Sequence, residues 1–503
     1  MPLLVDRFND FKFGVVNAIE PPEIPKEAVH KSQNMYYREN RWRKMPGFGQ
    51  LNTTSMGAFN VRGLGKYHDL VVGKKILMAA CGTNIYKFTD GITPESVYNQ
   101  LIEDDIEFLE YPPYIYFGSQ NNLWRRYDGG AITQTVGGNQ GNAADAPRKF
   151  SKIIFNDYSG RFFGIGDPVN PDYLNWSAHI DNEGIEKWPD GNSQIVPSRF
   201  GDVPLHADVY EGRITIFNKN SMSSGSVVGV PENWSFQSEK TQTGYLAPRT
   251  VKRYGNFFFG LTPDFEVYQW PSDKFITKGR VKFNIDPNSA KLACAEIVED
   301  RYYDICFKSG EAVPSDNYHW WRYDVLGDRW YGPHTQRNIS TMLYDKDDRL
   351  LYCGGADNFQ GLIFPLQGRN IHTSAMNCHL MTGFANQGDI RYDKRYVMLR
   401  VKAKQTGSLA GGQGQLEIIV NVDQLSGYPQ SQRMTLEDPA TNPLANLSDI
   451  KDAVIKRLHI FEQYGRGSSV QFEFKHSVFN GDFELSEFEC DYFARTKKEL
   501  RGV

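Results

Sequence analysis

The sequence contains few of the short motifs that mark enzymes. It has no GxxxxGK[ST] phosphate-binding loop, no GxSxG nucleophile turn and no HExxH pair of zinc ligands. Its ten histidines show no spacing that would pair them on a metal. We therefore expect a protein that is not an enzyme, with no catalytic residue, no metal site and no cofactor.

Cysteine is scarce, and the sequence has no CxxC pair. Most of the six cysteines lie in apolar runs that predict strands: Cys81, Cys294, Cys306, Cys353, Cys378 and Cys490. We expect buried thiols in a reducing compartment, not a disulfide framework or a zinc site. The first ten residues carry Asp6, Arg7 and Asp10 and no long apolar run. We therefore expect neither a secretory signal nor insertion into a membrane.

Basic residues are not in excess, because 56 lysines and arginines face 60 aspartates and glutamates, for a net charge of −4. The chain therefore lacks the overall positive charge that is typical of nucleic-acid-binding proteins. Aromatic residues, by contrast, are plentiful at 14% of the chain, which fits β-sheets packed face to face. The length of 503 residues predicts about three domains, although a fold built from repeated small sheets can form a single large domain.

The stretch Glu299–Pro333 contains the unit from which the chain is built. It holds a β-prone run at Tyr302–Phe307, a polar loop, a strand ending at Tyr323, a tight turn at Asp324–Gly327 and a third strand around Trp330. Similar units begin near residues 75, 113, 160, 212, 256, 301 and 349. A repeat of about 40–50 residues with several strands in each predicts a β-propeller.

We count about seven blade-like units, and six or eight are also compatible with the repeats. A generic all-β sandwich with coincidental hairpins is the alternative, so the fold class is all-β in either case. Within the blades, we expect a structural role for five residues that combine an aromatic strand with a turn: Tyr127, Asp128, Tyr323, Asp324 and Trp330.

The repeats divide the chain into an N-terminal arm at 1–60, a propeller at 61–370 and a C-terminal β domain at 371–503. The C-terminal strands alternate apolar and polar residues, as in an antiparallel sandwich, and a β-bulge near Ser486–Glu487 would restore one buried face. The arm contains a basic and aromatic hairpin that turns at Glu39–Asn40. We expect it to contact another subunit or the ring above it through residue types enriched at interfaces: Tyr36, Tyr37, Arg38, Arg41, Trp42, Arg43 and Lys44. A hairpin packed within its own chain is the alternative.

The hairpin and a strand that follows it resemble known proteins. The hairpin carries Asn34, Met35, Tyr36, Arg41, Arg43, Lys44, Pro46, Gly47 and Phe48, and Gly82–Lys87 (GTNIYK) follows at the start of the repeats. This plan resembles that of the tail hub, nozzle and head-completion proteins of short-tailed bacteriophages. The resemblance implies a virion protein of the tail, assembled in the host cytoplasm, that extends the DNA channel below the portal and serves DNA retention and ejection. It also implies a homo-oligomeric ring of six copies, contacts with other tail, portal or adaptor proteins, and passage of double-stranded DNA without sequence-specific binding.

A second function stays open on the residues alone, namely a carbohydrate-binding or carbohydrate-active propeller with a sugar-binding sandwich. Propeller glycosidases use paired carboxylates near the axis. The Ser-x-Asp-x-Gly-x-x-Trp turn of sialidases is not repeated in this sequence. A ring with an open channel would favour the tail protein, and a monomer or small oligomer with an acidic pocket would favour the sugar-active protein.

The turn of the Glu299–Pro333 unit generates a stability prediction. If Trp330 is buried between neighbouring sheets, Trp330→Ala leaves a large cavity and lowers the free energy of unfolding by about 3–5 kcal/mol. Thermal and urea denaturation measure this loss. An unchanged melting temperature would mean that the turn and its tryptophan are misplaced.

Overall fold

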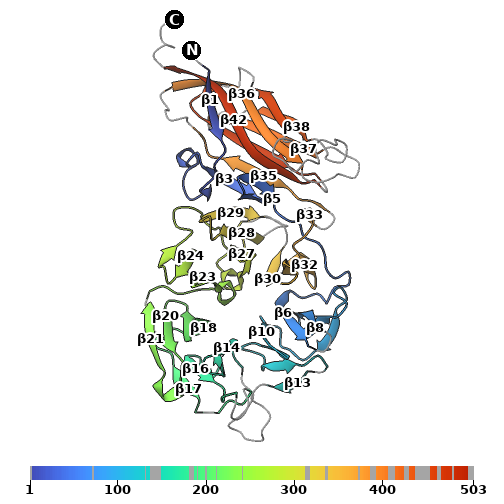
Figure 1. Cartoon of the computed structure of the whole chain (residues 1–503), viewed down its shortest axis with the longest axis vertical. Coiled ribbons are helices and arrows are strands. Elements are labelled where there is room, and N and C mark those ends of the chain that lie inside the picture. The colour runs from blue at the N-terminus through green and yellow to red at the C-terminus, as the bar shows by residue number, and fades with distance from the viewer. Residues whose placement is uncertain are drawn as a thin grey trace.

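The computed structural model describes residues 3–496, apart from 71–72, 131, 136–148, 181–185, 190, 199–200, 211, 241, 312–317, 335–337, 372–373, 386–391, 406–413, 424–429, 437–453, 461–465 and 479–480. Figure 1 shows a ring of small sheets in its lower part and a layered β body, which holds both termini, at the top. The helices in the described residues are single 3₁₀ turns: η1 (Pro21–Glu23), η3 (Pro231–Asn233), η4 (Pro248–Thr250), η5 (Ala290–Leu292) and η6 (Asp357–Phe359). No helix in this part of the chain has the length and apolar character needed to cross a membrane.

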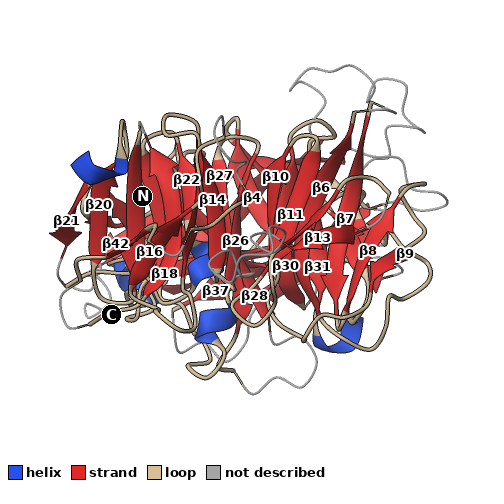
Figure 2. Ribbon diagram, turned by 90° about the horizontal axis from the view of Figure 1, so that it is seen from below, coloured by secondary structure: helices blue, strands red, loops and turns tan. Residues whose placement is uncertain are grey.

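Six antiparallel meanders of four strands form the blades of a β-propeller, which confirms the all-β propeller prediction (Figures 1 and 2). The first three blades are β6 (Val61–Asp69), β7 (Lys74–Cys81), β8 (Asn84–Phe88) and β9 (Glu95–Tyr98); β10 (Glu107–Tyr111), β11 (Tyr114–Gly118), β12 (Arg125–Tyr127) and β13 (Ile132–Thr135); and β14 (Lys152–Asn156), β15 (Arg161–Ile165), β16 (Tyr173–Trp176) and β17 (Ser193–Ile195). The next three are β18 (Pro204–Tyr210), β19 (Arg213–Asn218), β20 (Met222–Ser226) and β21 (Ser235–Lys240); β22 (Lys252–Tyr254), β23 (Phe257–Leu261), β24 (Val267–Trp270) and β25 (Lys274–Phe275); and β26 (Cys294–Val298), β27 (Tyr302–Lys308), β28 (Tyr318–Asp324) and β29 (Arg329–His334).

A three-stranded sheet lies against the first blade and accounts for the seventh repeat. Its strands are β30 (Ile339–Asp345), β31 (Leu350–Gly355) and β32 (Ile363–Pro365). The Ser340 hydroxyl donates a hydrogen bond of 2.6 Å to the Val61 carbonyl, and Lys66 pairs with Asp345 at 2.5 Å. The count of about seven units thus corresponds to six four-stranded blades and this smaller sheet.

Charged side chains from different blades meet where the innermost strands converge. Lys152 of the third blade lies 3.7 Å from Glu107 of the second, and Lys252 of the fifth lies 2.9 Å from Glu296 of the sixth. The Arg249 guanidinium, from η4 between the fourth and fifth blades, lies 3.0 Å from Asp105 ahead of the second blade and also donates to the Ser340 carbonyl. Single side chains therefore reach from one blade to another across this part of the ring.

The second body is a sandwich of two sheets to which both ends of the chain contribute. Its seven-stranded sheet has the order β39-β36-β42-β5-β4, with β1 beside β42 and β40 beside β36. The bounds are β1 (Leu4–Phe8), β4 (Met35–Arg38), β5 (Arg41–Lys44), β36 (Tyr392–Gln405), β39 (Val454–His459), β40 (Arg466–Gly467) and β42 (Phe483–Thr496). The segment 1–60 therefore pairs with 371–503, and the division into three domains stays a prediction.

A ten-stranded sheet runs from the propeller into the sandwich without a break. Its order is β26-β27-β28-β29-β2-β3-β35-β41-β37-β38. The strands beyond the sixth blade are β2 (Gly14–Val15), β3 (Ala28–Gln33), β35 (Cys378–Thr382), β37 (Gly414–Val422), β38 (Gln430–Leu436) and β41 (Val470–His476), and a two-stranded ribbon, β33 (Asn370–Ile371) and β34 (Ser374–Ala375), lies apart from it. The short strand β2 joins the two parts, because it pairs in parallel with β29 on one side and with β3 on the other. Gly14 lies opposite Trp330 of β29 and Ala28 of β3.

Two local predictions are confirmed in these sheets. Lys402 faces Glu487 and Ala403 faces Leu485, so Ser486 is the extra residue of a β-bulge and the buried face continues across it. In the sixth blade the Gly327 amide donates to the Asp324 carboxylate at 3.0 Å, which closes the predicted turn.

The joint at Gly14 generates a stability prediction with a matched control. Gly14 has a φ of +62°, and a Cβ atom there would lie 2.6 Å from the Trp330 carbonyl oxygen, whereas Gly73 has a φ of +67° and nothing within 4 Å of the same position. Alanine is equally strained at both, so only Gly14→Ala also pushes two strands apart. We expect Gly14→Ala to lower the free energy of unfolding by about 1–3 kcal/mol more than Gly73→Ala does, as measured by urea denaturation. Equal losses would show that the joint does not depend on this close approach.

Candidate functional site

The predicted hairpin is present as β4 and β5. Arg38 pairs with Arg41 across a two-residue turn, and the turn residues Glu39 and Asn40 have φ values of 53° and 59°. Positive φ at both positions is the geometry that matches the twist of two antiparallel strands. The prediction of a turn at Glu39–Asn40 is confirmed.

Three residues of this hairpin are buried within their own chain, although a subunit contact was expected for all seven. Tyr37, Trp42 and Lys44 are 3%, 0% and 6% exposed, so strands of the same chain already cover them. Trp42 faces Leu485 of β42 and packs edge-on against the Phe11 ring at 5.5 Å. The physical reason is the two-residue period of a strand, which turns every other side chain of the hairpin into the core.

The three arginines of the hairpin are partly exposed and form ion pairs. Arg41 and Arg43 lie 2.7 and 3.1 Å from the two carboxylate oxygens of Glu484, and Arg38 lies 3.2 Å from Glu299 of the sixth blade. The subunit contact of the hairpin stays a prediction.

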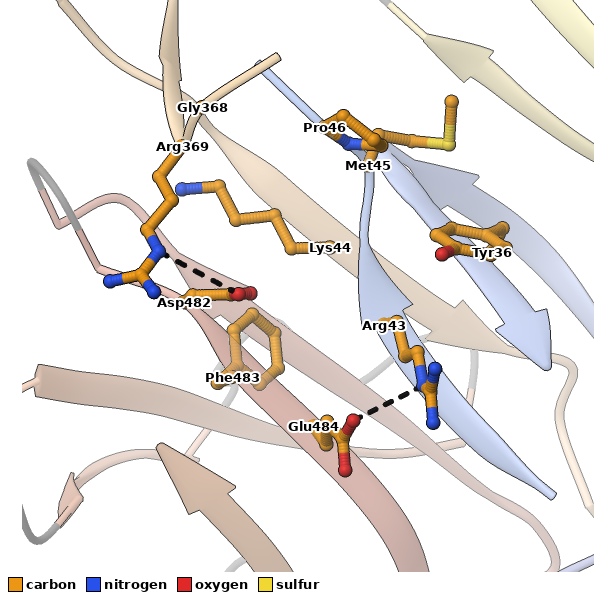
Figure 3. Close-up of a pocket in the computed structure, with 10 residues that line it drawn as sticks. All are labelled: Tyr36, Arg43, Lys44, Met45, Pro46, Gly368, Arg369, Asp482, Phe483 and Glu484. Carbon is orange, nitrogen blue, oxygen red and sulfur yellow. Dashed lines mark ion pairs between the residues drawn. The ribbon is translucent and has the colours of Figure 1, made fainter. Parts of the chain in front are cut away.

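A groove of about 460 Å³ lies beside the hairpin and is the candidate site (Figure 3). Its walls come from three segments far apart in the sequence: the hairpin from Tyr36 to Pro46, the loop at Gly368 and Arg369, and the start of β42 from Asp482 to Glu484. In Figure 3 the Lys44 and Arg369 side chains point toward the same side of the groove, next to Asp482.

Gly47 holds the hairpin against the Arg369 loop. A Cβ atom at Gly47 would lie 2.1 Å from the Asn370 carbonyl oxygen, so only glycine permits this approach. The amides of Gly47 and Phe48 donate to the carbonyls of Gly368 and Asn370 at 3.0 and 2.9 Å. These contacts place Arg369 at the edge of the groove.

Some charged side chains of the groove have close partners of opposite charge, and others do not. Arg43 is well paired, since it also lies 2.8 Å from Glu39, whereas Arg369 lies 3.9 Å from Asp482. Lys44 donates one hydrogen bond of 2.7 Å to the Gly481 carbonyl. Burial lowers the pKa of the Lys44 ammonium, and Arg369 acts in the same direction, while Cys378 and Asp482 oppose the shift.

His476 lies beneath the groove on β41. Its ring packs against Phe483 at a tilt, with 4.6 Å between centroids, and neither ring nitrogen has a hydrogen-bond partner in the described part of the chain. Burial, and then the charge of Lys44, lowers the pKa of His476 to about 3. The imidazole is therefore neutral at physiological pH, which limits the number of charges around Lys44.

Sequence reasoning did not find His476, Arg369, Asp482 or Glu484. Asn480-Gly481-Asp482 is a recognisable turn signal, but nothing local indicates that this turn meets a hairpin more than 400 positions earlier. Only the pairing of β42 with β5 brings Glu484 to Arg43.

The residues expected to have a structural role in the blades lie at the ends of strands β12, β28 and β29 and, for Asp128, directly after β12. The Tyr127 hydroxyl donates to the Gly129 carbonyl at 2.9 Å, and the Asp128 carboxylate accepts from the Gly130 amide at 3.0 Å. The Tyr323 ring packs 5.0 Å from Trp330, whose indole donates to the Ile276 carbonyl at 3.0 Å, and Asp324 accepts two hydrogen bonds from Arg301. Trp330 thus contacts the segment that follows the fifth blade.

The groove is lined by several charged side chains. Its polar groups are mainly cations and carboxylates, which recognise charge. Within the described residues, no group of three His, Cys, Asp or Glu side chains is placed to hold a metal ion.

Comparisons with known proteins add little. No family model and no curated protein matches this chain. Among solved structures, the extracellular domain of a two-component system protein from B. thetaiotaomicron matches with a TM-score of 0.43 and 11% identity, over 86% of this chain and 60% of that one. PorZ, a surface component of the type-IX secretion system of Porphyromonas gingivalis, matches with a TM-score of 0.36 and 11% identity, over 69% of this chain and 44% of that one. This chain thus spans less than two thirds of either protein, neither is a phage tail protein, and likenesses at these scores carry no information about function.

His476 generates a prediction about pH. Its pKa in the folded protein, about 3, lies below the usual value of 6.5, so the unfolded chain takes up the proton first as the pH falls. Above about pH 6.5 His476 is neutral in both the folded and the unfolded chain, and its contribution to the stability is complete. Between pH 6.5 and pH 3 the unfolded chain binds the proton more readily, so the free energy of unfolding falls. We expect His476→Leu to reduce the slope of unfolding free energy against pH in this window by up to about 1.4 kcal/mol per pH unit.

Urea denaturation between pH 4 and 7 measures this slope. His68→Leu, at the partly exposed end of β6, is the control for replacing a histidine as such. Identical slopes for the wild type and His476→Leu would contradict the buried, neutral imidazole.

Proposed function

We propose that this chain is a structural protein of a bacteriophage tail, in which copies of it form a closed ring around the path of double-stranded DNA. The ring would belong to the virion, assemble in the host cytoplasm, contact other tail, portal or adaptor proteins and catalyse no reaction. The resemblance carried by Asn34–Phe48 and Gly82–Lys87 supports this proposal. The number of copies, six, comes from the same resemblance.

The ten-stranded sheet is the observation that carries the proposal. It makes the propeller and the sandwich one hydrogen-bonded body, because β2 pairs with β29 on one side and with β3 on the other. A flexible linker would let the two parts move independently, whereas a continuous sheet transmits force between them. Such stiffness suits a ring that must keep its shape while DNA under pressure passes through it.

The DNA path in this proposal lies between copies of the chain and not along the propeller axis. The Arg249 side chain by itself bridges from η4 to Asp105, with 3.0 Å between guanidinium and carboxylate. The two segments are therefore only one side chain apart, and a DNA duplex does not fit between them. Contacts between unlike surfaces of neighbouring copies close into a ring when the rotation per copy divides a full turn. A wall of lysine and arginine would hold the phosphates through release of counterions, so a passive channel needs acidic or neutral walls.

Electron microscopy of the purified protein, followed by a structure of the assembled ring, tests this proposal. We expect a ring of six copies with an open channel lined mainly by Asp, Glu and neutral polar residues. A channel ringed by Lys and Arg would refute the passive conduit, and an assembly without a channel would refute the tail ring. A monomer that binds or cleaves glycans in a saturable way would instead favour the carbohydrate-active alternative.

A further inference from the structure

Lys44 carries a buried positive charge with unused hydrogen-bonding capacity. An ammonium group has three N–H donors. Lys44 is 6% exposed, and in the described residues its Nζ donates only to the Gly481 carbonyl, at 2.7 Å. A buried ammonium without a full set of partners costs free energy that a suitable ligand would recover.

Among the side chains that the structure describes, the ion pairs around the groove leave one positive charge unmatched. The cations are Arg41, Arg43, Lys44 and Arg369, and the anions that contact them are Glu39, Asp482 and Glu484. Arg41 and Arg43 are matched by Glu484 and Glu39 at 2.7 to 2.8 Å, so the excess charge lies at the Lys44 end. That end is also where the one long pair, between Arg369 and Asp482 at 3.9 Å, lies.

The opposite wall of the groove is apolar. Tyr36, Met45 and Pro46 line it, as Figure 3 shows, while Lys44 and Arg369 lie toward the other side. A volume of about 460 Å³ is larger than a single small ion requires and accommodates a short stretch of peptide. The groove therefore offers one charged position beside an apolar surface.

We propose that this groove binds an Asp or Glu side chain presented by an extended segment of a partner protein, with its carboxylate between Lys44 Nζ and the Arg369 guanidinium. The carboxylate would accept the unused N–H donors of Lys44 and match the single excess charge. The stem of the side chain and its neighbours would lie against Tyr36, Met45 and Pro46. This inference concerns one chain and does not depend on ring formation.

A phosphate group fits the same position less well. Phosphate brings up to two negative charges, and Asp482 and Glu484 on the groove wall would repel the second. The groove thus favours a carboxylate over nucleic acid or free phosphate.

Isothermal titration with small probes at constant ionic strength tests the proposal. The probes are N-acetyl-glutamic acid α-amide, its neutral glutamine counterpart and inorganic phosphate. We expect the acid to bind wild-type protein at least tenfold more tightly than the amide, and more tightly than phosphate. Arg369→Gln, at a side chain 38% exposed, and Lys44→Met should each weaken acid binding tenfold or more.

Lys66→Met is the matched control, because Lys66 is also a largely buried lysine but is paired with Asp345 on the first blade. It should leave binding unchanged. Equal binding of acid and amide, tighter binding of phosphate, or wild-type binding by Arg369→Gln would each overturn the proposal, and the last measurement stands even if Lys44→Met fails to fold. None of these results bears on whether a ring forms, so this proposal and the tail function can fail separately.

Discussion

The protein depends on one close approach, in which the backbone of Gly14 lies between β29 and β3. A Cβ atom at Gly14 would lie 2.6 Å from the Trp330 carbonyl oxygen, and any side chain would therefore separate the sixth blade from the sandwich. Three contacts continue the joint: Tyr331 to the Tyr37 carbonyl at 2.9 Å, the Gly332 amide to Ser32 at 3.0 Å, and the Asn34 amide to His334 at 2.9 Å. These three contacts join the same sixth blade to the segment that follows β2 and extend the joint beyond Gly14.

The position of the hairpin follows from this joint. Because β3 is held beside β29, the chain that leaves β3 must turn back along the sixth blade, and the Tyr36 ring comes to lie 5.7 Å from the Arg322 guanidinium. Arg322 forms a buried pair with Asp304, with N–O distances of 2.8 and 2.7 Å. A buried ion pair adds little net stability but penalises any arrangement that separates its partners. We infer that it selects this packing of the hairpin over others.

The groove depends on the same packing, because its three walls come from segments that meet only when the hairpin lies in this position. The hairpin brings Lys44, the contact at Gly47 brings Arg369, and the pairing of β5 with β42 brings Glu484.

The propeller is organised in a different way. Its blades pack in chain order, and pairs such as Lys252 with Glu296 at 2.9 Å link one blade to the next. The propeller is therefore locally determined, and the groove is not.

The amino-acid sequence by itself determined what depends on neighbours in the chain. The all-β class, the blade repeats, the hairpin turn at Glu39–Asn40, the bulge at Ser486 and the Asp324–Gly327 turn all follow from strand periodicity and turn chemistry. The tertiary structure alone decided that the first sixty residues pair with the last part of the chain, that Trp42 is core, and that Lys44 meets Arg369. These outcomes depend on which face of a strand is covered by another strand hundreds of residues away, and alternation along one strand cannot reveal its partner.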